Sequence, residues 1–164
     1  NERIKNNIEE VKLNQIINID FIKCEILGVK NPEITNNAFN NSSMVIKMNL
    51  EKSSILFLGD TGEESGDKLL NTQKDKLKSD IVQVAHHGQR GVDFDVYELV
   101  SPKFAFWPTP KWLWDNTEYM GKGNPGDGPF KTPEVIEWMM KIGSVNVTSF
   151  EKTICFDTKT KSII

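Results

Sequence analysis

The sequence of 164 residues contains only two cysteines and two histidines. Cys24 and Cys155 lie far apart, and neither has a second Cys or His at the spacing of a zinc knuckle or a CxxC redox motif, which excludes both kinds of site. We interpret the cysteines as buried free thiols in two strands, with a disulfide as the alternative. They therefore do not identify the compartment of the protein.

Long apolar runs are absent as well. No stretch approaches the roughly 20 residues that a membrane-spanning helix needs, and no basic segment followed by an apolar one marks a targeting signal. We therefore expect this segment to be soluble, while the compartment, cytoplasmic or extracytoplasmic in a bacterium, stays open. With 20 basic and 23 acidic residues, the net charge of −3 does not indicate broad electrostatic capture of nucleic acid.

Motifs for a protein nucleophile and for a nucleotide-binding loop are also missing. The sequence has no G-x-S-x-G elbow, no Cys/His pair and no Walker A sequence, despite Gly121-Lys122-Gly123. The sequence therefore offers no recognisable motif for covalent catalysis by a side chain or for nucleotide binding.

The sequence does contain a hairpin pattern followed by alternating helices and strands. This order predicts an α/β fold, a mixed sheet with helices on one face, in one domain over residues 19–164. Residues 1–18, with Ile4, Ile8 and Val11 at helical spacing, predict a helix or a connecting segment outside that domain. The expected strands are 19–29, 44–50, 54–58, 80–85, 103–107, 144–150 and 153–157, the expected helices are 63–77, 92–100 and 132–143, and a long loop covers 108–131.

Polar groups follow two of the buried strands. Asp60 ends the first, in FLGD, and His86 and His87 end the next, in VQVAHHG. A Gly-Asp after a strand is by itself usually only a turn, but the carboxyl ends of neighbouring parallel strands meet in one crevice. We therefore expect Asp60 and the histidines to be neighbours, and carboxylate and imidazole are good ligands for zinc or manganese.

The segments ILFLGD, DIVQVAHHG and SPKFAF resemble the C-terminal motifs of the metallo-β-lactamase superfamily, in particular its DNA-uptake competence-type hydrolases. The resemblance implies the C-terminal half of an αββα sandwich, with a loop such as Asn41-Ser42-Ser43 before the hairpin. It implies that Asp60 bridges metal ions, that one of His86 and His87 is the last metal-ligand histidine, and that the other meets the substrate. We favour His87 as the ligand and His86 as the catalytic residue, and the opposite assignment stays open.

The superfamily's HxHxDH signature cannot be present, because His86 and His87 are the only histidines. The resemblance implies two zinc or manganese ions in a complete domain, whereas this chain by itself should be inactive and could bind none. We expect the N-terminal half of the same domain, carrying the signature, to be the missing partner. Without it, one sheet face that includes Val45, Ile55, Phe57 and Val82 or their neighbours should be uncovered, which predicts a homodimer or domain swapping. The alternative is that residues 1–18 fold back over this face as a lid.

The residues after the histidines and in the long loop are candidates for substrate binding. Gln89 stands where the family often has Ser, and Trp112 and Trp114 could stack on a base while Lys111 lies near a phosphate. Packing of the tryptophans against the missing half of the domain or against a partner is the alternative.

Two hypotheses for function remain. The first is a metal-dependent hydrolase in which a metal-activated water attacks a phosphodiester or related ester, with a nucleic acid or phosphoester as substrate. The second is a metal-free binding or assembly module that keeps the fold without catalysis.

Overall fold

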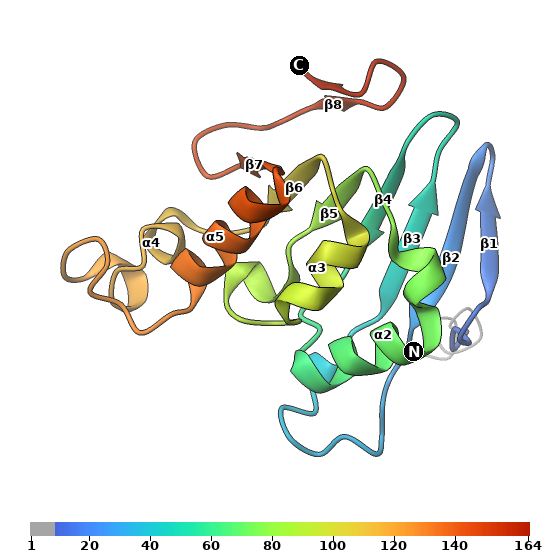
Figure 1. Cartoon of the computed structure of the whole chain (residues 1–164), viewed down its shortest axis with the longest axis horizontal. Coiled ribbons are helices and arrows are strands. Elements are labelled where there is room, and N and C mark those ends of the chain that lie inside the picture. Colours follow the sequence, from blue (N-terminus) through green and yellow to red (C-terminus); the bar gives the residue numbers. More distant parts are fainter. Residues whose placement is uncertain (1–8) are drawn as a thin grey trace, which may run out of the picture.

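The computed structural model describes residues 9–164, which form a seven-stranded mixed sheet and a separate two-stranded one (Figure 1). The sheet order is β1-β2-β3-β4-β5-β6-β7, antiparallel from β1 to β4 and parallel from β4 to β7. The strands are β1 (Ile16–Ile19), β2 (Ile22–Gly28), β3 (Val45–Asn49), β4 (Ser54–Phe57), β5 (Ile81–Gln83), β6 (Phe104–Trp107), β7 (Val145–Thr148), β8 (Phe156–Asp157) and β9 (Ser162–Ile163). The helices are α2 (Glu63–Leu77), α3 (Phe94–Val100), α4 (Lys111–Trp114) and α5 (Thr132–Ile142), with 3-10 turns η1 (Asn40–Ser42), η2 (Ala85–Gly88) and η3 (Tyr119–Gly121).

Helices α2, α3 and α5 connect the parallel strands and lie together on one face of the sheet (Figure 1). Leu56, Val82 and Ala105 are in register on β4, β5 and β6, and all three are completely buried under this helix layer. Tyr97 of α3 is also completely buried, and burial raises the pKa of its hydroxyl, which therefore stays neutral. The predicted α/β fold with helices on one face is confirmed.

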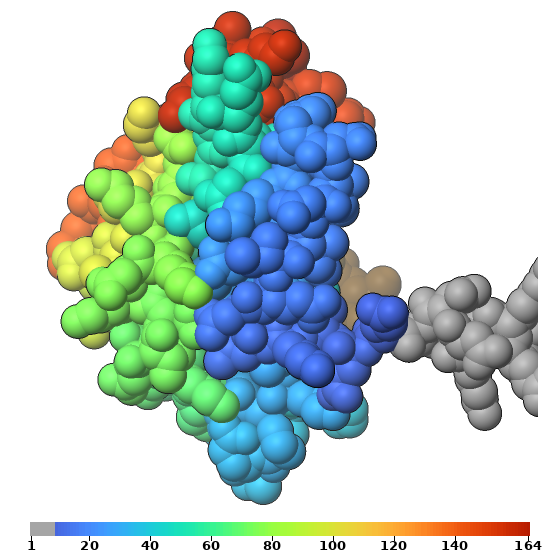
Figure 2. All heavy atoms as spheres, turned by 90° about the vertical axis from the view of Figure 1, so that its right-hand side faces the viewer, coloured from blue at the N-terminus to red at the C-terminus, as the bar shows by residue number. Residues whose placement is uncertain are grey.

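The opposite face of the sheet has no helix layer in the described part of the chain. Ile46, Phe57 and Gln83 are in register on this face. An apolar hollow of about 390 Å³ crosses it from β1 to β4, lined by Val11, Ile17, Ile19, Cys24, Ile26, Met44, Ile46, Met48 and Phe57. We call this surface the open face. Figure 2 looks onto the sheet edge formed by the N-terminal strands, in blue, with the C-terminal segment, in red, at the top.

Two of the residues expected on the uncovered face lie elsewhere. Val45 and Val82 are buried on the helix side, whereas Phe57 and its alternate neighbour Ile55 lie on the open face. The prediction was wrong for the two valines. Side chains alternate between the two faces of a strand, so an error of one residue in the expected register places a side chain on the wrong face of the sheet.

The N-terminal part of the domain also differs from the prediction. The single strand expected over residues 19–29 is a hairpin of β1 and β2, because Asp20 adopts a left-handed turn conformation (φ 51°) between them. No helix occurs within residues 9–18, and β1 begins inside the segment that is predicted to lie outside the domain. The predicted helical positions Ile4 and Ile8 lie outside the described residues.

The last expected strand does not join the main sheet. β8 pairs with β9 instead, and the Phe156 ring packs edge-on against Phe104 and Phe106 of β6. Lys161 then binds Asp80 at 3.0 Å. Burial would raise the pKa of Asp80, but hydrogen bonds from Lys161 and from the backbone of Ser54 outweigh it and lower that pKa.

Both cysteines are free thiols, as interpreted from the sequence. Cys24 is buried in β2, but Cys155 is exposed, because it lies before β8 in a segment outside the main sheet. Among residues 9–164, no helix combines the length and the apolar character needed to cross a membrane.

Candidate metal centre

Asp60 follows β4 in a tight turn at the carboxyl edge of the parallel strands. Gly59 adopts a left-handed conformation (φ 59°), and a side chain at this position would lie 3.2 Å from Cβ of Ser43. The Asp60 N–H donates to the Ser43 hydroxyl oxygen at 3.1 Å. The Asn41-Ser42-Ser43 loop therefore supports the turn that carries the carboxylate.

The two histidines follow β5 in a strained turn at the same edge. His86, His87 and Gly88 all have positive φ (50°, 56° and 81°), a conformation that residues with a side chain rarely adopt. The His86 N–H donates to the Gly59 carbonyl at 2.9 Å, which joins this turn to the Asp60 turn. Gly88 lies directly on the buried Trp107 ring. Backbone strain of this kind is concentrated at functional sites.

The β6–α4 connection determines the orientation of the His87 ring. Nδ1 of His87 lies 2.7 Å from the Pro108 carbonyl oxygen, and because a carbonyl can only accept, Nδ1 must carry the proton. The buried Thr109 hydroxyl donates to the main-chain oxygen of His87 at 2.6 Å. In the neutral ring this leaves a lone pair on Nε2, which faces Oδ1 of Asp60 at 3.6 Å.

This pair of donor atoms has the geometry of two ligands of one metal ion. Two ligands at about 2.1 Å from a tetrahedral zinc ion would be about 3.4 Å apart, close to the observed 3.6 Å. Both side chains are partly open to solvent, Asp60 at 41% and His87 at 49% exposure. A metal-binding histidine also usually donates its second ring N–H to a carbonyl or carboxylate, as His87 does to Pro108. The donor set fits a divalent ion.

The pair is not a complete site. Across residues 9–164, no group of three or more His, Cys, Asp or Glu side chains could hold a metal ion. A catalytic zinc needs three protein ligands and a water. Asp60 and His87 could therefore supply two of the ligands of such an ion.

His86 is arranged differently from His87. Asn40 Nδ2 lies 3.1 Å from Nε2 of His86, and since an amide nitrogen can only donate, Nε2 accepts and Nδ1 carries the proton. Nδ1 is buried and has no hydrogen-bond partner among the described residues. The geometry therefore favours His87 over His86 as the metal ligand.

Asn41 fixes the loop that reaches both turns. It is completely buried, and its side chain accepts from the Ser65 N–H at 3.1 Å and donates to Glu64 and to the Asn36 carbonyl. Its carbonyl oxygen accepts from Asn31 and from the Ser65 hydroxyl. These bonds attach the loop to the first turn of α2, which places Asn40 against His86.

The other expected site residues take part in local packing. Lys111 forms an ion pair with Asp115 at 2.5 Å. The Trp114 ring packs edge-on against Trp107, and Trp112 packs against Tyr119 and Phe130. Half-buried Gln89 follows the histidine turn, and its N–H donates to the His86 carbonyl at 2.9 Å.

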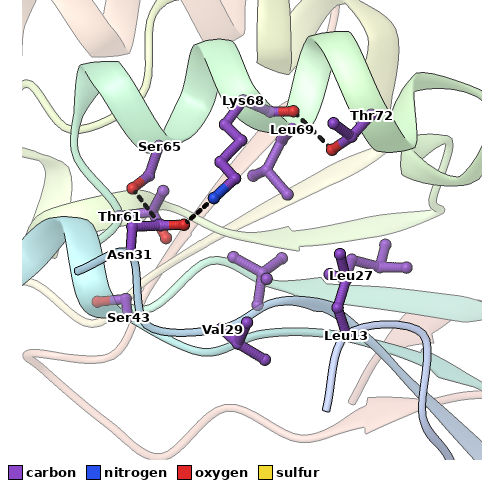
Figure 3. A pocket seen from close by; sticks show the side chains of 12 residues that line it. Leu13, Leu27, Val29, Asn31, Ser43, Thr61, Ser65, Lys68, Leu69 and Thr72 are labelled. Carbon is purple, nitrogen blue, oxygen red and sulfur yellow. Dashed lines mark hydrogen bonds between the residues drawn. The ribbon is translucent and has the colours of Figure 1, made fainter. Parts of the chain in front are cut away.

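A small cavity of about 40 Å³ lies behind the Asp60 turn, between α2 and β2 (Figure 3). Ser43, Thr61, Ser65 and Lys68 contribute to its polar side, and Lys68 donates to Asn31 at 2.6 Å. Since one water occupies roughly 10–15 Å³ by this measure, the cavity has room for a few waters and not for a substrate.

Comparison with known proteins agrees with this fold. No family model matches the chain. ComE operon protein 3 of Bacillus subtilis (strain 168) is 31% identical over 99 residues, which is 60% of this chain and 12% of that protein. A crystal structure from Parabacteroides distasonis ATCC 8503, of a protein proposed to be a metal-dependent hydrolase, superposes with a TM-score of 0.53 at 14% identity, over 85% of this chain and 56% of that one. The chain therefore has an α/β fold of the kind found in that hydrolase-like protein and spans only part of the length of either relative.

Proposed function

We propose that the chain is part of a metal-dependent hydrolase of the metallo-β-lactamase superfamily, in which Asp60 and His87 bind a zinc or manganese ion. The observation that carries the proposal is the His87 ring: Pro108 holds the proton on Nδ1, and the free Nε2 faces the Asp60 carboxylate at 3.6 Å. The structural similarity to a protein proposed to be a metal-dependent hydrolase supports it.

In this proposal, residues 19–164 are the C-terminal portion of an αββα domain. The remaining ligands, those of the HxHxDH signature, come from polypeptide that is not in this sequence, and the complete site holds two ions. The chain alone is inactive, because two ligands leave an ion too exposed and too weakly held for catalysis.

The proposed substrate is a phosphodiester or related ester. Bound ions would lower the pKa of a water to near 7 and offset the negative charge that develops on the substrate. His86 is proposed to meet the substrate once Asn40 releases its Nε2, and Gln89 lies next to it in the same turn. Binding by Trp112 and Trp114 would use ring surface that is not in their packing contacts.

The metal site can be tested on the chain itself by NMR with Mn²⁺, which broadens signals near the ion. We expect selective broadening of the His87 ring and the Asp60 amide, and weaker binding by at least tenfold in Asp60→Asn, which replaces a charged carboxylate ligand with a neutral, weaker amide oxygen. Asp95→Asn, a change of the same type in the first turn of α3, is the control. Broadening that is weak, unselective and unchanged in Asp60→Asn would rule out the proposed site.

The second candidate, a metal-free binding or assembly module, is favoured by one observation: the described residues contain no group of three metal-binding side chains. If wild type does not bind Mn²⁺ at His87, and the complete protein also contains no metal, this function replaces the first.

We also propose that the open face is covered in the complete protein by the missing half of the domain, and in the isolated chain by a second copy. Its hollow of about 390 Å³ is lined almost entirely by apolar side chains, a surface that water solvates poorly. Light scattering at tens of micromolar should therefore show a dimer, and Met44→Lys in the hollow should make it monomeric. Leu99→Lys is the control, because Leu99 has the same 43% exposure as Met44 but lies on α3. A wild-type chain that is monomeric at this concentration would contradict the proposal.

A further inference from the structure

Gln83 is the last residue of β5, three positions before His86, and its half-buried side chain lies on the open face. Its carboxamide reaches across to the end of the neighbouring strand β4. Oε1 accepts from the Leu58 N–H at 3.1 Å and from the Gly59 N–H at 2.8 Å. Nε2 donates to the Val84 carbonyl at 2.5 Å and lies 3.4 Å from the Gly59 carbonyl.

These bonds lie where regular pairing between the strands ends. The last paired residues are Phe57 of β4 and Gln83 itself, after which Gly59 turns the chain into its left-handed conformation. Beyond that point, the Leu58 and Gly59 N–H groups donate to Oε1 of Gln83 instead of to a strand partner. The Gly59 carbonyl accepts from the His86 N–H. Gln83 and His86 therefore hold Gly59 from two sides.

The contacts have a direct consequence for the donor atoms. Asp60 is the residue after Gly59, and His87 is the residue after His86, so the distance between their side chains depends on how the two turns are joined. No other side chain among the described residues hydrogen-bonds the Leu58 or Gly59 amides.

We infer that Gln83 is a positioning residue of the metal centre, which sets the place of Asp60 relative to His87 through the backbone of Gly59. The inference rests on the proposed metal binding by Asp60 and His87. Gln83 itself does not touch the ion, since its carboxamide is occupied by main-chain groups of the two turns.

The test compares Gln83→Met, which keeps the length of the side chain but removes both hydrogen-bonding groups, with wild type in the same Mn²⁺ titration. We expect about tenfold weaker binding, as is typical when groups that orient ligands are removed. We also expect the two ligands to separate, so that Mn²⁺ still broadens the His87 ring but broadens the Asp60 amide much less. The Leu58 and Gly59 amides should exchange with solvent faster in metal-free protein, since their acceptor is gone.

Gln73→Met is the matched control, because Gln73 is a buried glutamine of α2 that is remote in sequence from both turns. If loss of a buried glutamine only loosened the fold in general, Mn²⁺ would broaden the His87 ring and the Asp60 amide less, to the same degree, and it would do so in both Gln83→Met and Gln73→Met. Equal Mn²⁺ affinity and equal broadening in wild type and Gln83→Met would overturn the positioning role while leaving the metal site intact. Absence of Mn²⁺ binding at His87 in wild type would instead overturn the two-ligand metal site of this chain, and this inference with it; the proposed function is lost as well if the complete protein contains no metal.

Discussion

The Gly88→Ala variant is expected to lose about 3 kcal/mol of unfolding free energy, from two separate sources. Gly88 has a φ of +81°, and an alanine in the left-handed region costs about 1–2 kcal/mol. The new Cβ would also lie 2.2 Å from Cζ3 of Trp107, a ring that is itself 1% exposed and cannot move away freely. Overpacking of this kind adds about 1–3 kcal/mol. Equilibrium unfolding in urea measures the sum.

Gly143→Ala separates the two sources. Gly143 has nearly the same φ, +83°, but no atom lies within 4 Å of the position where its Cβ would be. We expect this control to lose only the backbone part, about 1–2 kcal/mol. If both variants lose the same amount, Trp107 does not restrict the histidine turn and the packing argument is wrong.

Trp107→Ala should be the more damaging change, with a loss of about 3–5 kcal/mol. The ring fills the space under Gly88 and packs edge-on against Trp114 at 5.1 Å. Its Nε1–H donates to Asn146 on β7 at 2.8 Å. Truncation would leave a large cavity at the carboxyl edge of the sheet, next to the Pro108 carbonyl that orients His87. The unfolding free energy from urea titration is again the measurement.

Trp107→Phe is the matched control, because it keeps an aromatic ring and loses the bond to Asn146. It should lose about half as much or less, since a neutral hydrogen bond contributes about 1 kcal/mol and most of the ring volume remains. A loss in Trp107→Ala no larger than in Trp107→Phe would mean that the cavity collapses and that Trp107 does not support the turn.

The residues that position the site differ in how clearly the sequence indicates them. Gln83 is a lone polar residue in the apolar strand segment VQVA, a pattern that indicates a polar side chain with a specific hydrogen-bonding role. Thr109, Pro108 and Asn40 carry no such signal. Thr109 and Pro108 act from 22 and 21 residues away from His87, and Asn40 acts from 46 residues away from His86. Such contacts depend on how loops meet at the sheet edge, which local patterns do not encode.

The sequence by itself determined the α/β layout, the helix over 63–77 and the proximity of Asp60 to the histidine turn. Hydrophobic periodicity and the order of helices and strands along the chain can both be read directly from the sequence. Only the tertiary structure decided that Nε2 of His87 is free while that of His86 is occupied, since each ring is oriented by a distant loop. It also decided which residues line the open face. Side chains alternate between the two faces of a strand, but only the register with neighbouring strands decides which set faces the helices and which set lies on the open face. From the sequence, the tryptophans after β6 could face a substrate, or pack against the missing half of the domain or a partner. In the structure, contacts with Trp107, Tyr119 and Phe130 occupy part of their ring surface.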